Sequence, residues 1–94
     1  MPEVLAPDAV DAALAERGIA WTRQGDELVK QVRRDGFAGA LQFVNAVGAL
    51  AEAADHHPDI DIRWNTVTLR LSTHSAGGLT ELDLALAAQV DGLG

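Results

Sequence analysis

Histidine is the residue type in this sequence that is best suited to proton transfer at neutral pH, and the chain has three histidines. His56 and His57 are adjacent and stand directly before Pro58, and His74 follows later in the chain. An imidazole can donate or accept a proton near neutral pH, so this set favours general acid–base chemistry. The sequence has no cysteine, which excludes a thiolate nucleophile.

Pro58 indicates how two adjacent histidines could reach one ligand. Neighbouring side chains on a continuous helix lie about 100° apart and do not face one object. A proline disfavours helical backbone in the residue before it. We therefore expect His56 on the last turn of a helix and His57 in the extended segment that follows, so that the two rings approach a small ligand from different directions.

Glu52 lies four residues before His56, on the same face of the predicted helix. Its carboxylate is expected to accept a ring N–H of His56 and so to fix the tautomer of that ring. A hairpin predicted after this helix returns the chain toward the helix end and carries His74 there. The sequence thus predicts one pocket that gathers three imidazoles and a carboxylate.

Alternative interpretations apply to each of these residues. The histidine pair could be a solvated helix end, and three histidines with Glu52 could hold zinc, although their spacing fits no zinc motif. We interpret Trp64 as part of the hairpin core rather than as a ligand contact. We interpret Asp83 as a helix-start residue rather than as a catalyst.

The apolar periodicity of the chain predicts helices that alternate with hairpins. A broad stripe with helical spacing marks the long segment before the histidine pair, whereas residues 60–72 alternate with a period of two. Turns are expected at Gly25 with Asp26 and at Asn65 with Thr66. We expect helices over residues 8–17 and 37–55, strands over 19–24, 27–34, 60–64 and 67–72, and a last helix that contains Leu82, Leu86 and Val90.

This order predicts an α+β fold, α-β-β-α-β-β-α, with a four-stranded antiparallel sheet and three helices packed on one face. Thr80 and Asp83, in the pattern T-x-x-D, resemble a capping box at the start of the last helix. The chain has 94 residues and shows no internal repeat or long linker, so we expect a single domain over residues 1–94.

The acidic composition limits the partners of the chain. Fourteen acidic residues against seven basic ones give a formal net charge of −7, which repels a phosphate backbone, so direct nucleic-acid binding is not expected. We see no apolar run of about 18 residues that would span a membrane. The first residues lack the basic and apolar regions of a secretory signal. We therefore expect no membrane segment and a cytoplasmic location.

The spacing of the polar and aromatic positions resembles the signature of the pterin-4a-carbinolamine dehydratases. The segments LSTH at residues 71–74 and GLT at residues 78–80 also resemble that family. The resemblance runs from about residue 19 to residue 90. The positions that match the signature are, in chain order, Glu52, His56, His57, Pro58, Trp64, His74 and Asp83.

This resemblance implies the same sheet with three helices on one side, assembled as a homodimer or homotetramer. It implies loss of water from 4a-hydroxytetrahydropterin to give quinonoid dihydropterin, which regenerates the pterin cofactor of aromatic amino acid hydroxylases. It implies neither a metal nor an organic cofactor. An imidazolium would protonate the leaving 4a-hydroxyl group, and a second group would accept a proton from a pterin ring nitrogen.

The resemblance also implies which residues act. The three histidines are the catalytic positions, and Glu52 is the supporting acid. Which histidine is the acid and which is the base stays open. Contacts to the pterin carry over to Asp55, His56, His57, Ser72, Thr73, His74 and Ser75.

A different function is compatible with the same fold. Some members of this family stabilise dimers of a homeodomain transcription factor, and others are suspected of helping enzymes to assemble. A small, acidic, oligomeric chain could therefore be a non-enzymatic assembly or regulatory module with a protein partner. A small metal-binding protein is the third interpretation.

Overall fold

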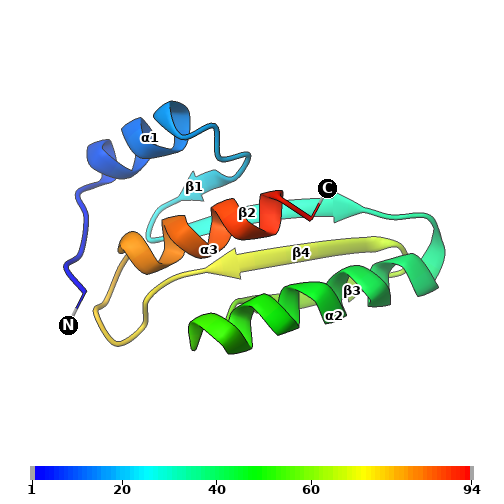
Figure 1. The fold of residues 1–94 in the computed structure, drawn as a ribbon. Coiled ribbons are helices and arrows are strands. Elements are labelled where there is room, and N and C mark those ends of the chain that lie inside the picture. Colours follow the sequence, from blue (N-terminus) through cyan, green and yellow to red (C-terminus); the bar gives the residue numbers. More distant parts are fainter. Residues whose placement is uncertain (1, 94) are drawn as a thin grey trace.

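The computed structural model describes residues 2–93 and contains three helices and four strands (Figure 1). Their order is α-β-β-α-β-β-α, which confirms the predicted fold class. The elements are α1 (Pro7–Glu16), β1 (Thr22–Gln24), β2 (Glu27–Arg33), α2 (Gly36–Ala54), β3 (Asp59–Arg63), β4 (Thr66–Leu71) and α3 (Glu81–Asp91).

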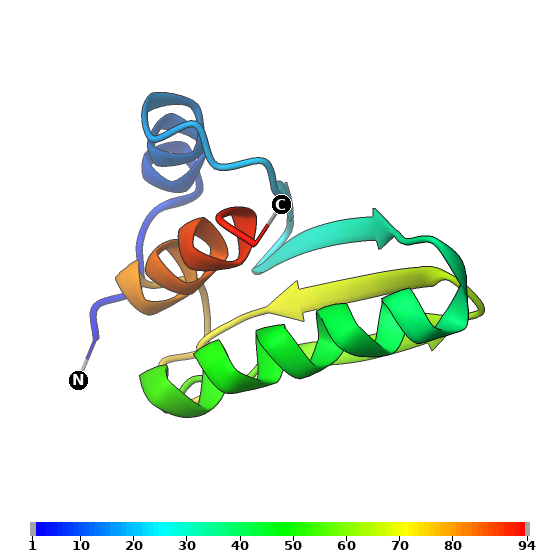
Figure 2. The ribbon, with the colours of Figure 1, turned by 45° about the vertical axis from the view of Figure 1, so that its right-hand side comes forward.

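The strands form one antiparallel sheet in the order β1-β2-β4-β3, so the two longest strands, β2 and β4, lie at its centre. Leu28 on β2 is opposite Leu71 on β4, and both are fully buried. Along β4, Val67 and Leu69 are also fully buried, whereas Arg70 between Leu69 and Leu71 is exposed. The alternation gives the sheet one apolar face, which α2 and α3 cover (Figure 2).

The helix α2 corrects the expectation that no segment is apolar and long enough to span a membrane. Gly36–Ala54 has 19 residues and a mean hydropathy of 1.3, so by length and composition alone it passes that test. In the fold it lies along the sheet (Figure 2), and its buried residues face the core. Two large apolar side chains of α2, Phe37 and Leu41, are 48% and 40% exposed.

The turn of the β3–β4 hairpin lies one residue earlier than predicted. Arg63 pairs with Thr66, so the turn consists of Trp64 and Asn65. Trp64 adopts a φ of 55° and its side chain is 69% exposed. The interpretation of Trp64 as hairpin core is therefore wrong, because a two-residue turn removes its side chain from both faces of the sheet.

The first two elements also differ in their bounds from the prediction. The helix α1 begins one residue earlier, because Pro7 occupies the first helical turn, and the residue before it, Ala6, makes no side-chain cap. The strand β1 is shorter than predicted and begins at Thr22. Ile19 and Trp21 are buried in the segment before it, so their apolar pattern reflected burial without strand pairing.

Candidate active site

The end of α2 directs the two adjacent histidines to opposite environments. Asp55 caps the helix in the left-handed conformation, with φ 51° and ψ 42°, which aspartate tolerates better than most residues. The N–H of His56 then donates to the carbonyl of Ala51 at 3.1 Å. The helix thus ends before the pair, not on His56 as predicted. The side chain of His56 turns inward and is 10% exposed, whereas that of His57 is 54% exposed.

His74 lies in a tight loop between β4 and α3. The N–H of Thr73 donates to the carbonyl of Gly78 at 3.0 Å, and the N–H groups of Ala76 and Gly77 both donate to the carbonyl of Thr73 at 3.0 Å. These bonds close the loop and leave His74 exposed at its surface. Because β4 runs antiparallel to β3, the loop emerges at the end of the sheet where the histidine pair enters β3.

One cavity of about 320 Å³ lies between the end of α2 and this loop. All seven positions expected to contact a pterin line it, so the structure brings the three histidines together. Two further residues, Pro2 and Leu82, line it although the sequence did not indicate them. The lining residues are Pro2, Asp55, His56, His57, Ser72, Thr73, His74, Ser75 and Leu82.

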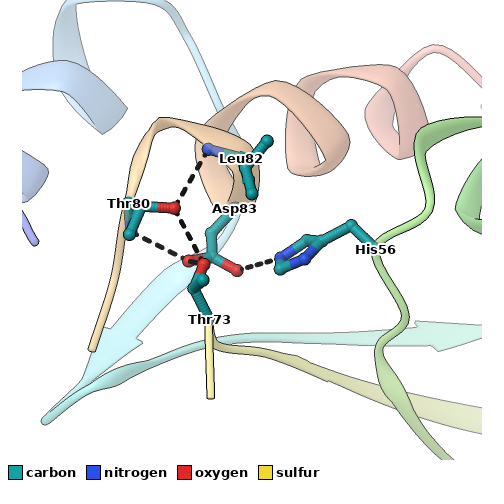
Figure 3. Close-up of polar contacts among 5 residues, drawn as sticks. All are labelled: His56, Thr73, Thr80, Leu82 and Asp83. Carbon is teal, nitrogen blue, oxygen red and sulfur yellow. Dashed lines mark hydrogen bonds and ion pairs between the residues drawn. The ribbon is translucent and has the colours of Figure 1, made fainter. Parts of the chain in front are cut away.

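Asp83 is a partner of this site that sequence reasoning missed. Its side chain is fully buried, and its Oδ1 lies 2.5 Å from Nε2 of His56 (Figure 3). Its other oxygen, Oδ2, accepts from the N–H of Thr80 at 2.9 Å, which completes the predicted capping box of α3. The interpretation as a helix-start residue is therefore right but incomplete, because the same carboxylate also holds a histidine of the cavity.

The direction of the hydrogen bonds around Asp83 follows from the number of donors. The hydroxyl of Thr73 donates its only hydrogen to Oδ2 of Asp83 at 2.7 Å, so Thr80 supplies the hydrogen in the 2.8 Å contact between the two threonine hydroxyls. The hydroxyl of Thr80 in turn accepts from the N–H of Leu82 at 3.2 Å. The hydrogen bonds therefore form a chain that ends at the carboxylate of Asp83 (Figure 3), and an ionised carboxylate can only accept.

His56 therefore donates from Nε2, which assigns its tautomer. Its Nδ1 is the ring nitrogen that remains for proton exchange with a ligand. The chain thus fixes one imidazole by a buried carboxylate that is itself held by two donors, the hydroxyl of Thr73 and the N–H of Thr80 at the start of α3. Such an arrangement holds the ring of His56 in one orientation for proton transfer.

Glu52 lies beside the other histidine of the pair. Its Oε1 is 3.6 Å from Nε2 of His57, and its side chain is 80% exposed. The prediction that Glu52 accepts from His56 is wrong, because the ring of His56 is turned inward to Asp83. At this distance the contact between Glu52 and His57 is electrostatic rather than a hydrogen bond, and solvent weakens it.

The geometry of the described residues does not support the zinc interpretation. Across residues 2–93, no group of three or more histidine, aspartate or glutamate side chains is arranged to hold a metal ion. In addition, Nε2 of His56 is engaged by Asp83. The three imidazoles line a common cavity without forming a coordination sphere.

Comparison with known proteins decides the family. The family model described as pterin 4 alpha carbinolamine dehydratase matches residues 3–93. The chain belongs to the pterin-4a-carbinolamine dehydratase family. A relative from Nocardia farcinica is 50% identical over 91 residues, which cover 97% of this chain and 95% of the relative. A relative from Roseiflexus castenholzii is 57% identical over 84 residues, which cover 86% and 90%. Both carry the provisional name pterin-4-alpha-carbinolamine dehydratase.

Solved structures of pterin-4a-carbinolamine dehydratase relatives share the fold. A Brucella melitensis protein described as a transcriptional coactivator/pterin dehydratase superimposes with a TM-score of 0.88 at 28% identity, over 97% of this chain and 98% of that chain. A pterin dehydratase-like protein described as a RuBisCO assembly factor gives a TM-score of 0.63 at 28% identity, over 78% and 84%. The resemblance predicted from the sequence is confirmed.

Proposed function

We propose that this chain removes water from a 4a-hydroxytetrahydropterin and releases quinonoid dihydropterin, as a pterin-4a-carbinolamine dehydratase. The observation that carries the proposal is the cavity that gathers His56, His57 and His74 with a buried carboxylate on one of them. Identities of 50% and 57% to relatives that bear the name of this enzyme, over nearly the full chain, support the same activity.

The reaction needs one acid and one base. The bond between C4a and the hydroxyl oxygen breaks, and the oxygen leaves as water after it takes a proton from an imidazolium. A pterin ring N–H loses its proton to the base, and the electron pair left on the ring forms the new double bond. No electron is gained or lost overall, so histidine side chains can supply all that the step requires.

We assign the base to His56. Asp83 holds Nε2–H of this ring, so the proton from the pterin goes to Nδ1, and the carboxylate stabilises the imidazolium that results. His57 and His74 lie on the exposed side of the cavity, where a leaving water can enter solvent. We assign the acid to one of these two, and Glu52 supports His57 by its charge.

Hydrogen bonds to the pterin edges are assigned to polar residues of the lining. Asp55, Ser72 and Ser75 have side chains at the cavity. Thr73 differs from them, because its hydroxyl donates to Asp83 and its backbone groups close the loop. We therefore propose that Thr73 supports the site through Asp83, while the other three contact the substrate. The proposal needs no metal and no organic cofactor.

The test of this function is the decay of a 4a-hydroxytetrahydropterin, followed at neutral pH with and without the protein. The proposed function predicts that the decay rate rises in proportion to protein concentration. A decay rate equal to that in buffer would overturn it. A parallel sample with Asp11→Asn, which removes an exposed carboxylate remote from the cavity, controls for nonspecific effects of protein.

We also propose a homodimer or homotetramer. Phe37 and Leu41 lie one helical turn apart on α2 and are 48% and 40% exposed, a surface that association would cover. The edge strand β3 is exposed as well, and such edges favour pairing with another chain. A cytoplasmic location stays part of the proposal, and fractionation of cells that express the chain tests it.

The alternative is a non-enzymatic assembly or regulatory module. The described roles of the two structural relatives, a coactivator and a RuBisCO assembly factor, support this second function on the same fold. The buried contact between Asp83 and His56 favours the enzyme, because an assembly surface needs no oriented imidazole in a cavity. High dehydratase activity together with no stable partner in a pull-down would exclude the alternative.

A further inference from the structure

Residues 2–5, which precede α1, lie against the loop that presents His74. The N–H of Leu5 donates to the carbonyl of Leu79 at 2.8 Å, and the side chain of Leu5 packs against the core. This bond anchors the segment beside the last residues of the loop. The neighbouring residues Val4 and Pro2 then reach two different parts of the site.

Val4 occupies the space that Gly78 leaves by having no side chain. A Cβ atom added to Gly78 would lie 2.9 Å from Cγ1 of Val4 and 3.7 Å from Cγ2. Gly78 is buried and also pairs with Thr73, since Thr73 N–H donates to Gly78 O at 3.0 Å. Val4 thus packs against the residue that closes the loop of His74.

Pro2 reaches the cavity itself. Among the described residues of the lining, it is one of two apolar side chains, and Leu82, which is 42% exposed, is the other. The remaining seven lining residues carry polar groups. A flat bicyclic ring needs polar partners at its edges and apolar surface at its faces, and Pro2 and Leu82 are the residues that offer such surface.

We propose that Pro2 and Val4 form part of the substrate site, in which Pro2 contacts the face of the bound ring and Val4 positions His74 through Gly78. The proposal rests on the proposed dehydratase function for its substrate. Val4 is a positioning residue, because it acts through the loop, and Pro2 is a residue that determines substrate affinity.

The packing of Val4 against Gly78 is tested by a pair of complementary substitutions. Gly78→Ala places a methyl group 2.9 Å from Cγ1 of Val4, whose side chain is 47% exposed and must shift, and we expect kcat/KM to fall about threefold because the loop of His74 loses this packing contact. Val4→Ala removes both Cγ atoms, and the nearest atom left, Cβ, would lie 4.0 Å from the new methyl group. The double variant Val4→Ala/Gly78→Ala should therefore recover most of the activity lost in Gly78→Ala.

Gly48→Ala is the matched control, because an added Cβ at that position meets nothing within 4 Å. It should leave kcat and KM unchanged. Wild-type activity in Gly78→Ala, or a double variant no better than Gly78→Ala, would overturn the positioning role of Val4.

Hydrogen exchange provides a readout that does not need activity. In Val4→Ala, the N–H of Thr73, which closes the loop, should exchange about tenfold faster than in the wild type. Unchanged exchange would contradict the proposal. If the wild type shows no dehydratase activity, the proposed function fails, and this measurement still decides whether Val4 holds the loop.

The contact of Pro2 is tested by binding of 7,8-dihydrobiopterin, measured by calorimetry. Pro2→Gly should weaken binding and raise KM by about fivefold with kcat nearly unchanged, because it removes only a binding surface. Glu3→Gly adds the same backbone freedom at the next residue, which does not line the cavity, and should leave binding as it is. Equal losses of affinity in the two variants, or unchanged affinity in Pro2→Gly, would contradict the proposed contact between Pro2 and the ring.

Discussion

Asp83 and His56 are 27 residues apart in the chain, and their side chains meet at 2.5 Å inside the protein. The same carboxylate caps α3 through Thr80 and holds the only inward-facing imidazole of the cavity. Folding of the last helix and orientation of the base therefore depend on one side chain.

Asp83→Asn tests the role of this carboxylate. The substitution keeps the shape of the side chain but removes its charge, so the imidazolium of His56 loses its partner. We expect kcat to fall about a hundredfold or more and the limb of the pH–rate profile that belongs to the base to shift. Steady-state kinetics over the pH range of histidine titration would measure both.

Thr80→Ala separates the loss of activity expected for Asp83→Asn from the loss of stability that follows when the cap of α3 is weakened. It removes the N-cap hydroxyl of α3 but leaves Asp83 beside His56, so we expect a loss of about 1 kcal/mol in the free energy of unfolding. Its kcat should fall less than tenfold. Equal kcat values in Asp83→Asn and the wild type would show that Asp83 only caps the helix.

His57→Ala and His74→Ala distinguish the two candidates for the acid. Both side chains are exposed, so neither substitution should change the melting temperature. We expect each to lower kcat, and the one that removes the acid to lower it about a hundredfold and to abolish the corresponding limb of the pH–rate profile. If both limbs persist in both variants, the assigned roles are wrong.

Glu52→Gln should have a small effect. Glu52 lies outside the cavity lining, and its carboxylate is 3.6 Å from His57 across a solvent-exposed gap. We expect kcat/KM to fall by about threefold, and added salt should reduce the difference between the variant and the wild type, because salt screens exposed charges. A hundredfold loss would instead place Glu52 among the catalytic groups.

Leu41→Glu tests the oligomer. The side chain of Leu41 is 40% exposed on α2, so a charge there should be tolerated by the isolated chain but not inside an apolar interface. Sedimentation should show that the wild type is a dimer or tetramer and that Leu41→Glu dissociates. Gln42→Glu adds a charge at the neighbouring exposed position and is the matched control. A monomeric wild type would contradict the proposed assembly.

The sequence predicted the parts of the site that depend on local rules. The break in the chain near Pro58 and the return of the hairpin placed His56, His57 and His74 around one cavity. The exact end of α2 was not predicted. The helix ends at Asp55, which adopts the left-handed conformation, and local sequence patterns do not distinguish this ending from a break at His57. Trp64 was assigned to the wrong environment. The alternation of the hairpin shows which residues share a face of the sheet, but it does not determine which two residues form the turn, and the turn lies one residue earlier than predicted.

Other features depend on contacts that local patterns do not encode. Asp83 already had a sufficient explanation in its capping box, so nothing in the sequence indicated its second partner. Glu52 had the right spacing to reach His56, but burial of that ring against Asp83 takes it out of reach. Pro2 and Val4 join the site only through the packing of an extended segment on a loop far along the chain.

The most direct test of the central claim is a single-turnover measurement of 4a-hydroxytetrahydropterin decay with the wild type and with the double variant His57→Ala/His74→Ala. If histidines in this cavity carry the reaction, the wild type accelerates decay in proportion to its concentration, whereas the folded double variant, which keeps the base His56 but loses the acid, gives a rate at least about a hundredfold lower. A double variant that accelerates decay as well as the wild type would contradict the account.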